Sequence, residues 1–286
     1  MPSAPDPLAH SPRHLSDPAG WVLYLSHSQP ERLIVFVHGF WGGVLKTWQH
    51  FPEGGLTRGW WRASDMLFAG YPSGLENITG TAYRLCRQLP RFFPDLPQGI
   101  LEEGGASPRS PSTTHYSELL LIGHSLGGVI LRRALCEAAH SWLEQRKADA
   151  QAPRPPLLRA KTRLFSPASA GFRPSGRLGQ LKAMSLLWLL CRIKLQGSSA
   201  FNDLQEGSQI LTDTRQRTEE FVGQQPDELC ALRAHVLWAN PENIVVTERY
   251  TTDYSSCSAD NTNHLSVCKP DNVYQIPWRF VETGEL

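Results

Sequence analysis

The apolar residues of this chain gather in short, nearly continuous runs that longer mixed stretches separate. Runs of about 4–8 residues without polar interruption are typical of strands that a parallel sheet buries on both faces. Such runs predict central strands at residues 32–37, 65–71 and 119–122. Two further strands of the sheet are predicted at residues 162–167 and 235–239, where polar residues accompany the apolar ones. A further run, residues 21–25, predicts an edge strand ahead of them.

Two of the intervening stretches carry apolar residues at helical spacing. Residues 78–89 place their apolar side chains on one face, and a proline ends the pattern. After the run 119–122, apolar residues recur with the helical period to about residue 145. Both stretches predict helices that connect strands, and another helix is expected to begin within residues 45–51.

Proline, glycine and polar residues dominate three other stretches. Residues 1–20 predict a flexible tail, residues 91–114 a mobile surface insertion, and residues 151–156 a proline-rich linker. The remaining chain, residues 21–286, is expected to form one domain, because α/β sheets of this size are often single domains.

A serine motif stands between the strand expected at 119–122 and the helix that follows it. Gly123-His124-Ser125-Leu126-Gly127 fits the Gly-x-Ser-x-Gly nucleophile elbow, in which a sharp turn holds a serine hydroxyl above the sheet. The turn is so tight that the residues flanking the serine must be nearly without side chains, as Gly123 and Gly127 are. Ser125 is therefore the candidate nucleophile, at the positive end of a helix dipole.

A second glycine motif follows the strand expected at 32–37. That run ends in His38-Gly39, and Gly39 lets the chain turn sharply enough to present a backbone N–H group. Acyl-transfer chemistry needs such an N–H beside a nucleophilic serine, because negative charge develops on the acyl oxygen.

These motifs, with Gly128 after the elbow, resemble the α/β-hydrolase superfamily, on the side of the lipases and related serine esterases. The resemblance extends over most of the chain, from about residue 32 to residue 277. It implies an α/β-hydrolase fold with a mostly parallel central sheet, helices on both faces and a cap or lid insertion at about 175–220. It also implies that the backbone N–H groups of Phe40 and Leu126 form the oxyanion hole.

Within the expected cap, residues 181–195 are strongly apolar and leave only a narrow polar face. Two interpretations are open. The stretch is either a cap helix that presents tryptophan and leucine side chains to an acyl chain or a lipid surface, or a helix that packs on the sheet.

A serine hydroxyl needs a histidine to take its proton and a carboxylate to orient that histidine. In α/β-hydrolases both partners follow the serine in the chain, and the acid precedes the histidine. Beyond the elbow and its helix only His235 and His264 remain, and His235 opens a strand ahead of the expected acid. His264 is the candidate base, and the Lys-Pro pair that follows it resembles the ending of related serine esterases.

The resemblance places the acid just past the strand expected at 235–239, shortly before a Val-Val pair. Glu242 stands there. Since aspartate is commoner at this place in the family, two further carboxylates stay open as the acid, Glu248 and Asp253.

With these residues in this order, the resemblance implies a serine hydrolase that cleaves carboxylic esters through an acyl-enzyme intermediate, without cofactor or metal. A thioesterase or an acyl-peptide hydrolase would use the same triad. A non-catalytic relative that serves as a binding module is the alternative from another class. The implied partner is an acyl-ester or lipid-like substrate, with transient contact to a membrane or micelle surface.

Composition limits which partners, metal sites and cellular compartments can be expected. The net charge is +1 and the basic residues are scattered, so nucleic acid is not expected as a partner. The chain shows neither a secretory signal nor an apolar run of the roughly 18 residues that a membrane helix needs. Its six cysteines include no Cys-x-x-Cys pair, so zinc is not expected. A disulfide between Cys257 and Cys268 stays open, although a reduced cytoplasmic protein is favoured.

Overall fold

The structure is a computed structural model that describes residues 9–18, 20–73, 75–103, 105, 107–110, 114–172 and 199–286. The first eight residues of the expected tail lie outside the described residues. The same holds for the expected cap up to residue 198, including the apolar stretch 181–195.

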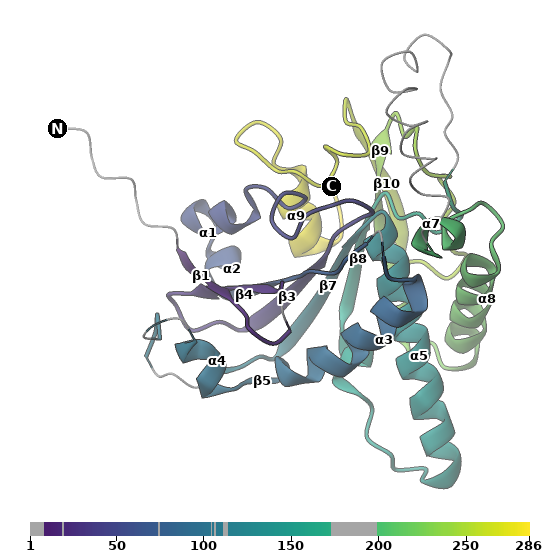
Figure 1. The fold of residues 1–286 in the computed structure, drawn as a ribbon, viewed down its shortest axis with the longest axis horizontal. Coiled ribbons are helices and arrows are strands. Elements are labelled where there is room, and N and C mark those ends of the chain that lie inside the picture. Colours follow the sequence, from purple (N-terminus) through teal and green to yellow (C-terminus); the bar gives the residue numbers. More distant parts are fainter. Residues whose placement is uncertain are drawn as a thin grey trace.

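Eight strands in the described ranges form one sheet, in the order β1-β2-β4-β3-β7-β8-β9-β10 (Figure 1). β2 runs antiparallel to β1 and to β4, and all the other neighbouring pairs are parallel. The strands are β1 (His10–His14), β2 (Val22–Ser26), β3 (Arg32–Val37), β4 (Ser64–Ala69), β7 (Glu118–His124), β8 (Lys161–Phe165), β9 (Ala234–Asn240) and β10 (Ser255–Asp260). β5 (Asp95–Leu96) and β6 (Thr114–His115) pair separately.

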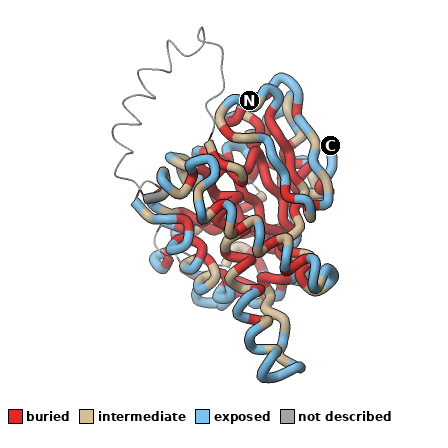
Figure 2. The backbone as a smooth tube through the Cα atoms, turned by 90° about the vertical axis from the view of Figure 1, so that its right-hand side faces the viewer, coloured by how far each residue is buried: buried red, intermediate tan, exposed pale blue. Residues whose placement is uncertain are grey.

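Helices cover both faces of the sheet (Figure 1). Alternate residues of β3 enter two cores: Val35 lies in the core that α3, α5 and α8 cover, and Phe36 in the core that α2 and α9 cover. Figure 2 shows that the buried residues gather in the interior and that the exposed residues lie on the outside. The helices are α1 (Gly54–Thr57), α2 (Gly59–Arg62), α3 (Ile78–Gln88), α4 (Gln98–Glu102), α5 (Leu126–Ala148), α7 (Ser199–Asp203), α8 (Gln209–Gln224) and α9 (Ile276–Thr283). Short 3-10 turns are η1 (Phe51–Glu53), η2 (Leu89–Arg91), η3 (Pro156–Arg159) and η4 (Cys230–Leu232).

The five expected strands, the edge strand and the two long connecting helices are all present, with ends shifted by a few residues. Of the helix expected to begin within residues 45–51, only the last residue is helical: turns continue to residue 50, the 3-10 turn η1 begins at Phe51, and α1 follows it. The described end of the expected cap is α8, which packs against α5: Arg217 of α8 pairs with Glu137 of α5 at 2.8 Å.

Two edge strands have no apolar run of their own. β1 lies within the stretch expected to be a flexible tail, so that expectation is wrong for residues 10–14. It pairs with β2 along its length, and the buried His10 donates from Nε2 to the Ser64 carbonyl at 2.8 Å. β10, Ser255–Asp260, is largely polar and was not expected, yet it pairs with β9 over six residues. Partner strands, more than their own residues, create both elements.

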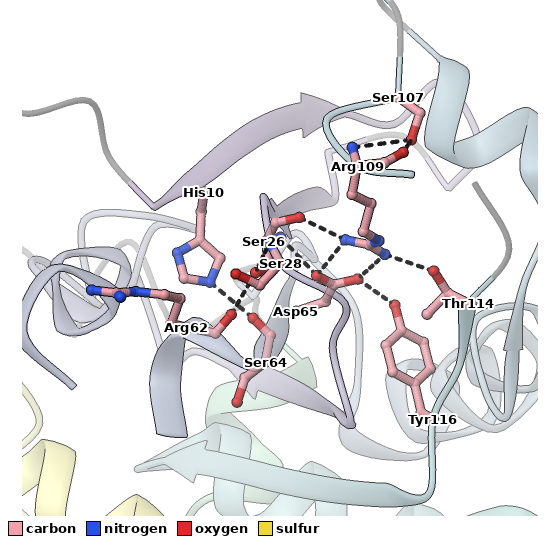
Figure 3. Close-up of polar contacts among 10 residues, drawn as sticks. All are labelled: His10, Ser26, Ser28, Arg62, Ser64, Asp65, Ser107, Arg109, Thr114 and Tyr116. Carbon is pink, nitrogen blue, oxygen red and sulfur yellow. Dashed lines mark hydrogen bonds and ion pairs between the residues drawn. The ribbon is translucent and has the colours of Figure 1, made fainter. Parts of the chain in front are cut away.

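Arg109, which belongs to the expected surface insertion, points its side chain into the protein interior (Figure 3). The Arg109 guanidinium donates to both carboxylate oxygens of Asp65, at 3.0 and 2.7 Å, and neither side chain is more than 1% exposed. The Tyr116 hydroxyl donates a hydrogen bond to the same carboxylate at 2.6 Å, and the Ser26 backbone N–H donates another at 2.7 Å. Asp65 is the second residue of β4, so this cluster ties the insertion to the amino-terminal edge of the parallel strands.

Cys257 and Cys268 are free thiols, so they do not form the disulfide left open by the sequence. In the stretches that the structure describes, none of the helices has the length and apolar character needed to cross a bilayer.

We expect the Arg109→Ala substitution to lower the free energy of unfolding by about 3–5 kcal/mol, because Asp65 would be left as an unpaired buried charge. Arg91→Ala is the control, since it breaks an exposed pair with Asp17. That change is expected to cost less than about 1 kcal/mol. Urea unfolding of the purified variants measures both, and similar losses would contradict the assignment.

Candidate active site

Loops after four strands meet at one edge of the sheet. The strands are β3, β7, β9 and β10, and their parallel course brings their carboxyl ends to the same side. β3 and β7 are neighbours, but the chain proceeds from β3 to β4 on one side and from β7 to β8 on the other. Open α/β sheets bind their ligands at such a switch point, beyond the carboxyl ends of the strands.

Ser125 occupies the turn between β7 and α5, with φ 53° and ψ −120°. A residue with a side chain adopts such a sparsely populated conformation at a cost of about 1–3 kcal/mol. Backbone hydrogen bonds hold the turn: the Ser125 N–H donates to Phe165 at 3.1 Å, and the Ser125 carbonyl accepts from Gly128 at 3.1 Å and Ala168 at 3.2 Å. A strained serine thus stands directly between a central strand and a helix, as in a nucleophile elbow.

This chain has the α/β-hydrolase fold. The elbow after β7 and a sheet in which β2 alone runs against the other strands decide the assignment. The predicted fold class, with a mostly parallel sheet and helices on both faces, is confirmed.

The glycines of both motifs stand where backbone segments touch. A Cβ atom on Gly127 would lie 2.0 Å from the Val37 carbonyl oxygen, and one on Gly123 would lie 2.7 Å from the Gly128 Cα. A Cβ on Gly39 would lie 2.9 Å from the Ser125 Cβ. A larger residue at position 39 or 127 would push the elbow and the loop after β3 apart, and one at position 123 would push the end of β7 away from the start of α5.

Phe40 and Leu126, the expected oxyanion donors, lie on the two segments that Gly39 and Gly127 bring together. Phe40 follows Gly39, and Leu126 is the first residue of α5. Within the described part of the chain, neither backbone N–H donates to another protein group. No described protein acceptor occupies either N–H group, as the prediction of an oxyanion hole requires.

His264 and Glu242 come together from the loops after β10 and β9. The His264 Nδ1 donates to the Glu242 Oε2 at 3.0 Å, and the two side chains are 5% and 1% exposed. Because a carboxylate only accepts, Nδ1 carries the hydrogen, and in the neutral imidazole Nε2 is then the nitrogen with the lone pair. The other carboxylate oxygen accepts the N–H groups of Ile244, at 3.0 Å, and Val245, at 3.3 Å. The imidazole is thus held in the form that can accept a proton at Nε2.

The environment of Glu242 favours its ionised form. Burial by itself raises the pKa of this carboxyl, but the hydrogen bond and charge of His264, the Ser166 hydroxyl and the Ile244 N–H outweigh burial and leave the pKa below its ordinary value. The Ser166 Oγ in turn accepts the Ala239 N–H at 3.0 Å. Glu242 therefore stays negative at neutral pH, as an orienting acid must.

The two rival carboxylates are paired elsewhere. Asp253 is buried and accepts both terminal nitrogens of Arg132, at 3.0 and 2.7 Å. Glu248 pairs with Arg215 on α8. Of the three candidates left open by the sequence, only Glu242 contacts His264 in the structure.

His124 ties the base loop to the elbow. Its Nε2 donates to the backbone carbonyl of His264 at 2.7 Å, and the two imidazole rings lie 4.9 Å apart. Burial, followed by the neighbouring His264, lowers the pKa of His124 to about 3, so the ring is neutral. Its Nδ1 is buried without a partner in the described chain. His264 is thereby fixed beside the residue that precedes Ser125.

The sequence does not indicate the hydrogen bonds that His124 and Ser166 make here. His124 is predicted only as a residue of the elbow motif, and Ser166 only as part of a strand. Their partners lie 140 and 73 residues away in the chain. No local pattern marks such contacts.

Comparison by sequence with known protein families and with curated proteins finds no match. Solved structures with a similar course of the chain include the naproxen esterase of Bacillus subtilis, with 17% identity, coverage of 96% of this chain and 92% of that one, and a TM-score of 0.47. The peroxisomal α/β-hydrolase Lpx1 of Saccharomyces cerevisiae has 12% identity, covers 99% and 86%, and has a TM-score of 0.48. The carboxylesterase CesB of Bacillus subtilis has 13% identity, covers 98% and 94%, and has a TM-score of 0.48.

The His124→Gln substitution is expected to weaken the pH dependence of stability. In the unfolded chain His124 takes up a proton near its ordinary pKa of 6.5, whereas in the folded chain it does so only near 3. Between these values the unfolded state binds more protons, so the free energy of unfolding falls as the pH falls, by up to about 1.4 kcal/mol per pH unit. Urea unfolding between pH 7 and pH 4.5 measures the slope, and parallel curves for the two proteins would refute the assignment.

Proposed function

We propose that this protein is a serine hydrolase that cleaves carboxylic esters through an acyl-enzyme intermediate. The observation that carries the proposal is the 3.0 Å hydrogen bond between His264 and Glu242, in a loop that His124 ties to the strained turn of Ser125. A nucleophile, a base in the right tautomer and an ionised acid are the parts that acyl transfer to serine requires.

In the proposed first half of the reaction, the Ser125 Oγ attacks the acyl carbonyl carbon while the His264 Nε2 takes its proton. The carbonyl oxygen becomes an oxyanion, which the N–H groups of Phe40 and Leu126 bind. Glu242 stabilises the imidazolium that forms. When the tetrahedral intermediate collapses, the bond to the alcohol oxygen breaks and His264 gives its proton to the leaving alcohol.

In the second half, a water molecule attacks the acyl-enzyme. His264 takes the proton of the water, the same N–H groups bind the second oxyanion, and the proton passes to the Ser125 Oγ as the acyl bond breaks. The products are a carboxylic acid and the free enzyme.

Aromatic side chains beside the proposed oxyanion hole support an apolar acyl or lipid-like substrate. The Phe40 ring stacks on Trp41, with centroids 5.5 Å apart, and meets the edge of Phe172 at 6.5 Å. Trp41 is 53% exposed, and Leu265, the residue after the proposed base, is 59% exposed. An acyl chain or a micelle surface would cover these apolar side chains, and binding would be favoured because apolar surface is removed from water.

A fluorophosphonate probe is expected to label the purified wild type and not the Ser125→Ala variant, because only an activated serine reacts with it. Labelling is read by gel fluorescence, with and without detergent micelles. A folded wild type that stays unlabelled under both conditions would rule out the proposed chemistry and favour a binding module. If labelling succeeds, an oxoester and a thioester of the same acyl chain separate an esterase from a thioesterase.

The Glu242→Ala substitution is expected to lower kcat by about 10⁴-fold, as loss of the orienting acid does in other serine triads. Glu248→Ala is the matched control, because Glu248 follows in the same loop but pairs with Arg215. That variant is expected to keep wild-type turnover of a p-nitrophenyl ester. The assignment of the acid fails if Glu242→Ala turns over at the wild-type rate.

A further inference from the structure

The loop after β4 contacts the loop that carries Phe40. Tyr71 donates its hydroxyl to the His38 carbonyl at 2.6 Å, and its ring stacks on the His38 imidazole, with centroids 4.3 Å and planes 12° apart. Two residues further along, Ser73 accepts the Trp41 backbone N–H on its Oγ at 2.9 Å. Tyr71 and Ser73 therefore hold the chain on both sides of Phe40.

The His38 imidazole extends this contact to the next peptide group. Its Nδ1 donates to the Gly39 carbonyl at 2.8 Å, and the Gly42 backbone N–H donates to the same oxygen at 3.0 Å. The C=O of Gly39 and the N–H of Phe40 belong to one planar trans peptide and point in opposite directions. Fixing the carbonyl of Gly39 on one side thus fixes the direction of the Phe40 N–H on the other.

We propose that Tyr71 is a positioning residue for the oxyanion hole: acting through His38, it holds the Gly39–Phe40 peptide so that the Phe40 N–H faces the oxyanion formed at Ser125. This inference rests on the proposed function. Tyr71 itself touches no reacting atom. Its hydroxyl and ring restrain the carbonyl and the imidazole of His38 together, so that the peptide does not rotate when the substrate carbonyl arrives.

The phenol suits this task. Burial raises the pKa of Tyr71 well above its ordinary value, so the hydroxyl keeps its hydrogen and remains a donor to the His38 carbonyl. A preorganised donor stabilises an oxyanion more than a mobile one, because no reorganisation is required during the reaction. The contribution is therefore greatest in the transition state and small in the bound substrate.

The test uses the full chain with Tyr71→Phe, which keeps the ring and removes only the hydroxyl. Tyr83→Phe is the matched control, because the Tyr83 side chain lies on α3 and is 60% exposed. Turnover of p-nitrophenyl butyrate gives kcat and KM. An alkyl trifluoromethyl ketone gives the affinity for an oxyanion, since the Ser125 Oγ adds to its carbonyl carbon, the proton passes to His264 and the carbonyl oxygen becomes negative.

For Tyr71→Phe we expect kcat to fall by about tenfold, less than the roughly 10²–10³-fold loss from removing a whole oxyanion donor. KM should stay within about twofold, and the affinity for the ketone should fall by the same factor as kcat/KM. Tyr83→Phe should match the wild type in all three. Ser73→Ala, which frees the Trp41 N–H on the other side of Phe40, should show the same pattern and serves as the second variant if Tyr71→Phe does not fold.

An unchanged kcat, or a loss of turnover with unchanged affinity for the ketone, overturns the inference. A rise of KM alone does so too, because it points to a role in binding the substrate. A wild type that neither hydrolyses the ester nor binds the ketone overturns the proposed function itself, and is recognised without any variant. Thermal unfolding of each protein separates these results from simple loss of the fold.

Discussion

The site depends on one steric constraint: two backbone segments pass each other so closely that neither has room for a side chain. Gly127 lies against the Val37 carbonyl and Gly39 lies against Ser125. Because β3 and β7 are parallel neighbours, their ends already lie side by side. The glycines let the turns that follow them close up further. Phe40, Leu126 and Ser125 thereby lie on two segments that the glycines bring into contact.

The remaining parts of the site are built around this contact. The strained conformation of Ser125 is held by bonds to the end of β8 and to the start of α5. The loop after β10 is drawn to the elbow by His124, and the loop after β9 supplies the carboxylate that meets His264. The loop after β4 holds the oxyanion segment from outside. Each loop follows a strand of the same sheet, so the positions of the strands determine where the loops place the site residues.

The central strands and the elbow could be predicted from the sequence because their signals are local. Continuous apolar runs mark buried strands, and a glycine pair around a serine marks the turn. β1 and β10 could not be predicted this way, since polar residues form them and a neighbouring strand stabilises them. The inward course of Arg109 was missed for a related reason: its partner, Asp65, lies 44 residues earlier in the chain.

Chain order and motif predict Ser125 and His264 and favour Glu242 as the acid, but they leave Glu248 and Asp253 open. The other two carboxylates are paired with arginines that are distant in the sequence. Arg132 lies 121 residues before its partner Asp253, and Arg215 lies 33 residues before its partner Glu248. Tyr71 and His124 were missed because their contacts are made to backbone carbonyls, which every residue possesses and which leave no mark in a sequence.

The acceptor of the His124 hydrogen bond is the main-chain carbonyl of residue 264, and it is present whatever side chain stands there. Replacing the imidazole of His264 would therefore remove the proton acceptor of the proposed reaction and leave the loop tied to the elbow. Under the proposed function, such a chain keeps this tie and lacks the group that starts the cleavage of an ester. The tether thus makes the protein convertible into a trap, from which an intact ester could be recovered and identified.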